Sequence, residues 1–181
     1  MSRLKPPVTE KDHQTGNSKA SVTLTEYGDY QCPYCGRAYP LLKRLLREKG
    51  QVVHFVFRNF PLQEIHPMAL SAALAAEAAA NQGKFWEMHD LIFEHQQELS
   101  LSRLIDFAQM LGLEMNQFTR DWQSEVTVSK VEADFESGLR SGVNGTPSFY
   151  VNGEKLNSYN ETYESLLDAI ETPVINSQVT S

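Results

Sequence analysis

The sequence predicts an α/β protein in which a central mixed β-sheet with flanking helices carries an all-helical insertion. A strand–helix–strand pattern occupies residues 21–57, and strand character returns only near residue 147. Between about residues 66 and 140, every strong signal has the period of a helix. Removing this helical block leaves a strand, a helix and a strand followed by a hairpin and a helix, which is the order of a three-layer α/β core.

The first half of the core is a βαβ unit. Residues 21–27 alternate and are rich in β-branched side chains, so we expect a strand there. Pro33 suits the first turn of a helix whose leucines recur at helical spacing until Gly50 ends it. Residues 51–57 are apolar on both faces, as in a central strand. The two strands should therefore be parallel and joined by a right-handed crossover.

The remaining elements follow from periodicity and turn residues. Residues 147–156 should form a hairpin about Asn152-Gly153, and Asn160 should cap a last helix. The helical block should contain helices over residues 68–81, 84–96, 102–111, 116–122 (capped by Asn116) and 128–139.

These elements predict the domain boundaries. Residues 1–20 lack periodicity and should form a flexible tail. Residues 21–171 should form one α/β domain with a helical insertion at about 66–140, and residues 172–181 should form a C-terminal tail.

Composition and charge exclude several function classes. A formal net charge of −7 and a pI near 5.2 argue against nucleic-acid binding and against attraction to anionic lipid. The longest apolar run, residues 68–80, is too short to span a membrane. The first twenty residues lack the apolar core of a secretory signal. We therefore expect a cytoplasmic protein, or a periplasmic or secreted one if an upstream signal was removed.

The chain has only two cysteines, Cys32 and Cys35, separated by a Pro-Tyr pair. A structural disulfide across so short a loop would stabilise the fold by only ~2 kcal/mol. A structural zinc site needs four ligands, and the next candidates, His89 and His95, lie far beyond finger-type spacing. The pattern favours a reactive dithiol, with neither a metal nor an organic cofactor.

The position of Cys32 favours a thiolate. It lies at the start of a helix, where free amide hydrogens and the dipole stabilise negative charge by up to ~2 kcal/mol, or about 1.5 pKa units. Because a free thiol has a pKa near 8.5, this leaves a large thiolate fraction at neutral pH. Cys35 is one turn further along the same face and should be shielded from solvent. We expect an attacking thiol and a resolving thiol.

Glu26 is the candidate proton acceptor. It shares one face of the first strand with Val22 and Leu24, which predicts that it points inward. A buried carboxyl group has a raised pKa and could take the proton from Cys35. The alternative is a glutamate at a strand end that bonds to water or to a cation such as Arg58.

Several segments resemble the DsbA-like family of the thioredoxin superfamily. The stretch "EYGDYQCPYC" at residues 26–35 resembles its strand-then-CxxC segment, and "SGVNGTPSFYVNG" at residues 141–153 resembles its cis-proline loop. The helical block, "FRNFPL" and "HPMALSAALAAEAA" are similar to other parts of that family. The resemblance spans residues 21–170 and implies a thioredoxin-like fold and thiol–disulfide exchange with protein thiols or disulfides.

The resemblance also implies roles for single residues. Cys32 would be the nucleophile, Cys35 the resolving thiol and Glu26 the buried acid. Pro147 would be the cis-proline that faces the disulfide, and Thr146 would offer backbone hydrogen bonds to an extended substrate segment. Two sets of neighbours would complete a substrate site: Pro33 and Tyr34 lie between the cysteines, and Tyr30 and Phe149 could help to shape an apolar groove.

Two departures from the family pattern leave the exact activity open. Strongly oxidising members have Pro-His where this chain has Pro-Tyr, and "CPYC" is similar to glutaredoxins, which favours a glutathione-linked enzyme. The threonine before the cis-proline resembles the residue that disulfide isomerases have at this position. Oxidase, reductase and isomerase all stay possible, with a cytoplasmic reductase, or a relay fed by another dithiol protein, favoured by the missing signal. A redox-inactive binding scaffold and a kappa-type glutathione transferase also stay open.

Overall fold

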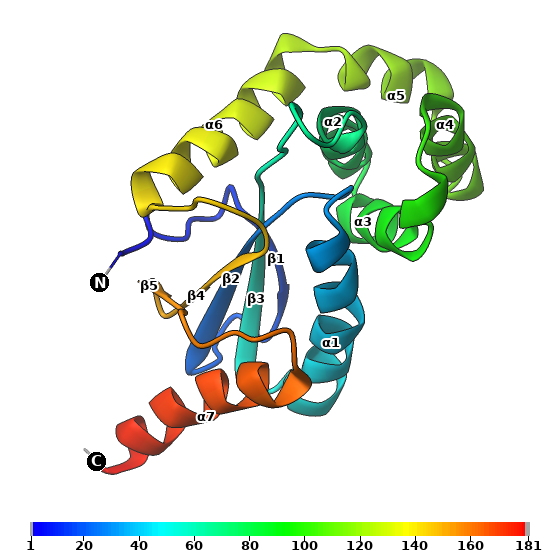
Figure 1. Cartoon of the computed structure of the whole chain (residues 1–181). Coiled ribbons are helices and arrows are strands. Elements are labelled where there is room, and N and C mark those ends of the chain that lie inside the picture. Colours follow the sequence, from blue (N-terminus) through cyan, green and yellow to red (C-terminus); the bar gives the residue numbers. More distant parts are fainter. Residues whose placement is uncertain (1, 180–181) are drawn as a thin grey trace.

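The structure, a computed structural model, describes the backbone of residues 2–179 and the side chains of residues 2–173. Its centre is a five-stranded sheet in the order β1-β3-β2-β4-β5 (Figure 1). The parallel β2–β3 pair is flanked by antiparallel neighbours, which confirms the expected mixed sheet. The strands are β1 (His13–Gly16), β2 (Val22–Gly28), β3 (Val53–Asn59), β4 (Ser148–Val151) and β5 (Glu154–Lys155).

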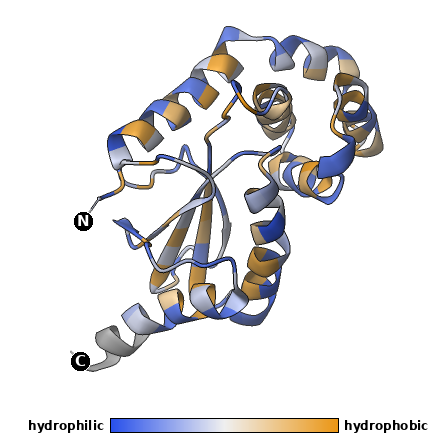
Figure 2. Ribbon diagram, in the orientation of Figure 1, coloured by the Kyte–Doolittle hydropathy of each residue, from blue (hydrophilic) through white to orange (hydrophobic). Residues whose placement is uncertain are grey.

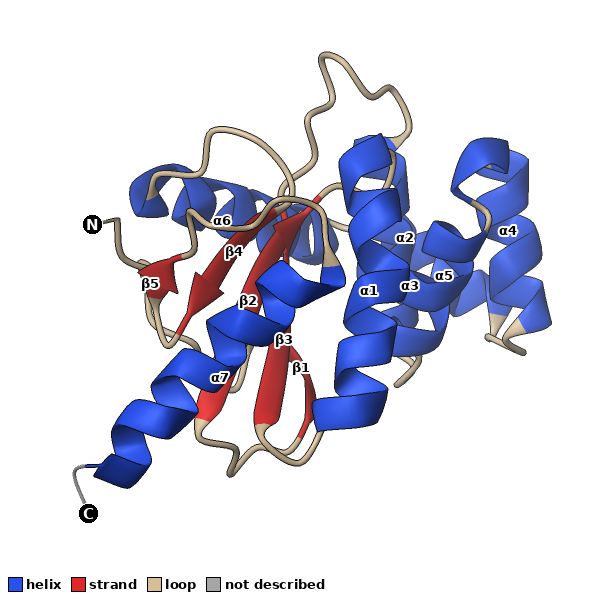
Figure 3. Ribbon diagram, turned by 60° about the horizontal axis from the view of Figure 1, so that its bottom comes forward, coloured by secondary structure: helices blue, strands red, loops and turns tan. Residues whose placement is uncertain are grey.

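Helices cover both faces of the sheet. Helices α1 (Pro33–Lys49) and α7 (Tyr163–Val179) lie on one face, and α6 (Glu125–Ser141) lies on the other (Figure 3). Along the chain, the rest of the helical block follows β3 and precedes α6. It consists of α2 (Ala69–Ala80), α3 (Phe85–Glu94), the short 3₁₀ helix η1 (Gln96–Glu98), α4 (Leu101–Met110) and α5 (Met115–Trp122). Among the described residues, no helix is both long and apolar enough to cross a membrane.

Hydrophobic residues occupy much of the central strands and stretches of the helices (Figure 2), and their buried side chains form the core. The main core lies between the sheet, α1, α7 and the helical block. Alanine-rich α2 is buried along most of its length and packs against α3, α4, α5 and α6. A smaller core lies under α6, where Gly138 allows close approach because a Cβ there would lie 2.5 Å from the Phe60 ring.

The expectation of a flexible tail over residues 1–20 is wrong. Residues 13–16 form β1, which pairs antiparallel with β3, and Leu4 is buried in the smaller core. The segment "HQTG" has neither alternation nor β-branched enrichment, apart from one threonine, so its sequence does not indicate a strand. Contacts with the rest of the fold hold it in place.

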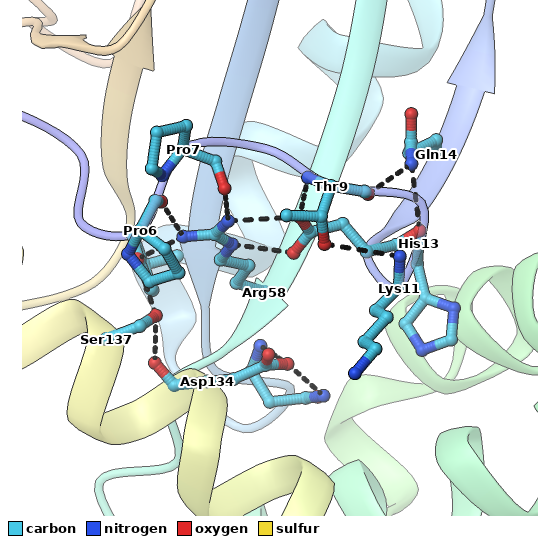
Figure 4. A network of polar contacts seen from close by, with 12 residues as sticks. Pro6, Pro7, Thr9, Lys11, His13, Gln14, Arg58, Asp134 and Ser137 are labelled. Atoms are coloured by element: carbon cyan, nitrogen blue, oxygen red, sulfur yellow. Dashed lines mark hydrogen bonds and ion pairs between the residues drawn. The ribbon is translucent and has the colours of Figure 1, made fainter.

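Arg58 of β3 provides a cluster of these contacts (Figure 4). Its Nε donates to Asp12 Oδ1 at 2.7 Å and its Nη2 donates to Asp12 Oδ2 at 3.0 Å, which is a bidentate ion pair. The guanidinium also donates to the carbonyl oxygens of Pro6 and Pro7 and to the Tyr27 hydroxyl. Burial alone would raise the pKa of Asp12, but the hydrogen bonds from Arg58 hold it below its usual value. One cation therefore joins residues 6, 7 and 12 of the N-terminal segment to β3.

Helix ends also differ from the expectations. Glu114, not Asn116, caps α5, because its carboxylate accepts from the amides of residues 116 and 117. At the start of α7, the Thr162 hydroxyl accepts from the Ser165 amide, so the expected cap at Asn160 is wrong. The expected tail from residue 172 is also wrong, because α7 continues through Pro173 to Val179. A proline removes one helical hydrogen bond, and this helix tolerates that loss. Residues 180–181 lie outside the described part of the chain.

The Arg58–Asp12 pair generates a test of the fold. Its side chains are only 3% and 7% exposed. Replacing Arg58 by alanine leaves a buried carboxylate unpaired, so we expect the free energy of unfolding in urea to fall by about 3–5 kcal/mol. Arg3→Ala is the matched control, since it breaks the solvent-exposed pair with Glu154 and should cost much less. Equal, small losses in both variants would contradict a structural role for the pair.

Candidate active site

The end of β2 and the start of α1 position Cys32. The Asp29 carboxylate accepts from the amide of Gln31 at 2.8 Å and from the amide of Cys32 at 3.2 Å, which closes a tight turn after the strand. Cys32 is the N-cap of α1, with extended backbone angles, and Pro33 occupies the first helical position. The cysteine therefore lies at the helix N-terminus, where the sequence predicts it.

The Cys32 sulfur lies in a setting that favours its negative charge. Cys32 is 4% exposed. In its thiol form it donates to the Thr146 carbonyl oxygen at 3.3 Å, a bond that stabilises the protonated form and that other contacts must outweigh. A hydrogen bond from the Cys35 thiol is the main reason why the pKa of Cys32 is lowered to about 5. The Thr146 side chain and the backbone amides of Cys35 and Tyr34 lower the pKa further, and together these contacts outweigh burial. At neutral pH the group is a thiolate.

The Cys35 thiol has the opposite tendency. It is fully buried one turn into α1, and its sulfur accepts from the Asp29 amide at 3.4 Å. Burial raises the pKa of Cys35 well above its usual value, as do the hydrogen bond with Cys32 and the charge of Glu26. One thiol is thus ionised and the other protonated at the same pH.

Glu26 points into the core on the same side of the sheet as α1. Its register neighbours are Phe57 on β3 and Phe149 on β4, and the residue is 2% exposed. Burial, and then the charge of Cys32, raises the pKa of Glu26 to about 8. Its Oε1 atom has no hydrogen-bond partner among the described residues. The alternative of a pair with Arg58 is wrong, because the Arg58 guanidinium bonds to Asp12 instead.

The loop before β4 completes the site. The Thr146–Pro147 peptide bond is cis, and the Thr146 carbonyl faces Cys32. The buried Thr146 hydroxyl has no partner in the described part of the chain while Cys32 donates to that carbonyl. When Cys32 is ionised, this hydroxyl is placed to donate to the sulfur.

The aromatic residues expected near the dithiol separate into two groups. Tyr34 is 51% exposed, the Arg37 guanidinium lies over its ring at 4.4 Å, and Pro33 is exposed beside it. Tyr30 and Phe149 are buried in the main core, so they do not line a surface groove.

Sequence reasoning missed three polar side chains that hold the Cys32 loop. Asp29 Oδ2 accepts from the Leu62 amide and lies 2.8 Å from His66 Nδ1, which ties the loop to the segment after β3. Gln96 donates to two carbonyl oxygens of the loop from the helical block. An aspartate three residues before a helix-capping cysteine is a turn signal that could have identified Asp29. Nothing in the local sequence could have identified Gln96.

The raised pKa of Glu26 generates a prediction about stability. Folding keeps this carboxyl group protonated, so the fold loses stability as the pH rises from the unfolded pKa of about 4.3 to the folded pKa of about 8. Glu26→Gln removes this penalty, and we expect the reduced variant to be more stable than the wild type at pH 7 by on the order of 2–4 kcal/mol. The difference should disappear at pH 4. Urea unfolding from pH 4 to 8 measures it.

The matched control is Glu132→Gln, which changes an exposed glutamate on α6. Because this side chain is exposed, the substitution should change the free energy of unfolding at pH 7 by little. If Glu26→Gln and the control changed the free energy of unfolding equally at every pH, burial in the fold would not keep the Glu26 carboxyl group protonated.

The fold is shared with solved structures of redox proteins. A thioredoxin-like oxidoreductase from Silicibacter pomeroyi DSS-3 is 27% identical, with a TM-score of 0.78 over 91% of this chain and 92% of that one. BdbD from Bacillus subtilis is 25% identical, with a TM-score of 0.80 over 96% and 97% of the two chains. The thiol-disulfide exchange protein α-DsbA2 from Wolbachia pipientis, 19% identical with a TM-score of 0.75 over 90% and 87%, shares the fold.

Curated relatives at higher identity are longer proteins. The Na⁺/H⁺ antiporter NhaA 3 of Salinispora tropica is 42% identical over 150 residues, which are 83% of this chain and 23% of that protein. The Na⁺/H⁺ antiporter NhaA of Herminiimonas arsenicoxydans is 40% identical over 169 residues, or 92% and 27% of the two chains. This chain therefore spans about a quarter of the length of these relatives.

The family model described as thioredoxin matches residues 8–172, which is nearly the whole described structure. Its match begins before β1 and includes the helical block. The chain belongs to the thioredoxin family, and it shares its fold with BdbD and with the thiol-disulfide exchange protein α-DsbA2.

Proposed function

We propose that this protein exchanges disulfides with protein substrates through Cys32 and Cys35, and that it acts mainly as an oxidant. The observation that supports this most is the difference in pKa between the two thiols. The pKa of Cys32 is lowered to about 5, whereas the pKa of Cys35 is raised. An attacking thiol must be ionised, and a resolving thiol must stay protonated until it is needed.

In the oxidising direction, the reaction begins from a Cys32–Cys35 disulfide. A substrate thiolate attacks the Cys32 sulfur, forms a mixed disulfide and releases Cys35. A second substrate thiolate then attacks the substrate sulfur of the mixed disulfide and releases the Cys32 thiolate. The substrate loses two electrons and gains a disulfide, and the protein gains the two electrons as a dithiol.

Glu26 handles the proton of Cys35 in this proposal. Because its pKa is about 8, the carboxyl group is protonated at neutral pH and can donate to Cys35 as that sulfur leaves. In the reverse direction it takes the proton back. The charge of Glu26 raises the pKa of Cys35, so the ionisation of the two groups is coupled.

The substrate would lie beside the loop that ends in Pro147. An extended segment can pair with the Thr146 backbone as an added strand, which places its cysteine over Cys32. Pro33 and Tyr34 are exposed between the two cysteines, and they would contact the same segment.

The low pKa of Cys32 supports the oxidising direction. Stabilising the thiolate stabilises the reduced form, which makes the disulfide more oxidising. Compared with the pKa of about 7 in thioredoxin, a pKa of about 5 favours the reduced form at pH 7 by about 2 kcal/mol, or roughly 50 mV. Such a pair suits compartments in which protein disulfides persist. Our proposal therefore departs from the cytoplasmic reductase that the sequence favoured.

Antiporter activity is not carried over to this chain, because the chain spans only about a quarter of those relatives. Their similarity supports a narrower proposal, which is that a domain similar to this chain can occur within a longer protein.

Trapping of the mixed disulfide tests the proposed function. In Cys35→Ser, the Cys32 thiolate should attack a disulfide of insulin and remain bound to it, because no resolving thiol is present. We expect a covalent adduct on non-reducing gels that dithiothreitol releases. Cys32→Ser should form none. If neither variant forms an adduct, exchange through this dithiol is excluded. An adduct with oxidised glutathione but none with insulin would favour a glutathione-linked enzyme instead.

A further inference from the structure

The Gln96 side chain reaches from the helical block into the backbone of the redox site. Its Nε2 atom donates to the Tyr30 carbonyl oxygen at 2.9 Å and to the Cys32 carbonyl oxygen at 2.8 Å. Gln96 begins η1, directly after α3, and is more than sixty residues from Cys32 along the chain. A single amide group thus bonds to the backbone on both sides of Gln31.

The Cys32 carbonyl has a particular place in α1. It belongs to the N-cap residue and accepts from the Gly36 amide at 3.0 Å. The same first turn carries the amides of Tyr34 and Cys35, which lower the pKa of the Cys32 thiol. A bond that fixes this carbonyl therefore fixes the direction in which those amides point.

Gly36 provides an independent observation. A Cβ atom at this position would lie 2.2 Å from Gln96 Oε1, with no backbone atom among its three nearest contacts. Within a helix, alanine is intrinsically favoured over glycine. The glycine is therefore best explained by the space that the Gln96 side chain needs.

We propose that Gln96 is a positioning residue for the Cys32 sulfur, through which the helical block helps to set the reactivity of the dithiol. The reactive role of Cys32 rests on the proposed function, but the positioning itself does not. Asp29 bonds to the amides of this loop and Gln96 bonds to its carbonyl groups, so the two side chains hold it from both sides. Without Gln96, the loop carbonyls would turn toward water and the first turn of α1 would lose its alignment with the sulfur.

The test measures the pKa of Cys32 in the full chain, by recording the thiolate absorbance at 240 nm as the pH is changed. Gln96→Met keeps the length of the side chain and removes its donor. Loss of these hydrogen bonds should raise the pKa of Cys32 by about 0.5–1. Alkylation of Cys32 by iodoacetamide at pH 5 should then slow about two- to fivefold, because a smaller fraction of the thiol is ionised.

Gln82→Met is the matched control. Gln82 also makes two side-chain bonds to backbone, both to residue 114 within the helical block, and it makes no bond to the redox site. The variant should lose stability in urea to a similar extent as Gln96→Met, yet Cys32 should ionise as in the wild type. This comparison separates positioning from a general loss of stability.

Gly36→Ala provides a second variant that does not alter Gln96 itself. The added methyl group should displace the Gln96 amide and raise the pKa of Cys32 in the same direction. In a Gln96→Ala background, which leaves the space open, the same substitution should have little further effect. Additive effects of the two substitutions would contradict the proposal.

The outcomes are distinguishable from those of the trapping experiment. If the pKa of Cys32 in Gln96→Met and in Gly36→Ala equals that of the wild type, the positioning role is wrong even when the mixed disulfide forms. If the pKa of Cys32 rises in both variants, the positioning role holds even when no protein substrate is trapped.

Discussion

A buried sulfur at the start of α1 carries a negative charge, and most of the site is arranged around that charge. The Cys35 thiol, the Thr146 side chain and the first amides of α1 all stabilise it. The thiol and the amides belong to α1, whereas Thr146 belongs to the loop before β4. These contacts exist together only because β2, between β3 and β4, delivers Cys32 to the place where the loop and the helix meet.

The burial that shields Cys35 also destabilises the ionised form of Glu26. A carboxyl group between Phe57 and Phe149 has no charged partner of opposite sign among the described residues, so the fold keeps it protonated at neutral pH. A core designed only for stability would place an apolar residue at this position. Local conflicts of this kind are typical of functional sites. The N-terminal segment shows the contrary case, since the buried charge of Arg58 is fully paired and serves only the structure.

Much of the fold could be predicted from local sequence, because β2, α1, β3 and the helical block have clear periodicity and the hairpin has an Asn-Gly turn. β1 could not be predicted, since its position depends on contacts with residues distant in the chain, among them the pairing with β3 and the neighbouring Arg58–Asp12 ion pair. For the candidate site, the helix dipole explains part of the acidity of Cys32, but the contribution of Thr146 depends on contact between segments far apart in the chain. Gln96 could not be predicted either, because it reaches the Cys32 loop from a segment far away in the chain.

Thiolate stabilisation should make the Cys32–Cys35 pair an oxidant, and the reduction potential of the pair measures this property. The protein would be equilibrated in glutathione buffers of graded ratio at pH 7, with Cys32→Ser as the blank. We expect a potential between about −230 and −120 mV. A value near −270 mV or below would mean that the thiolate is not stabilised as the contacts around Cys32 indicate, and that the pair is not an oxidant.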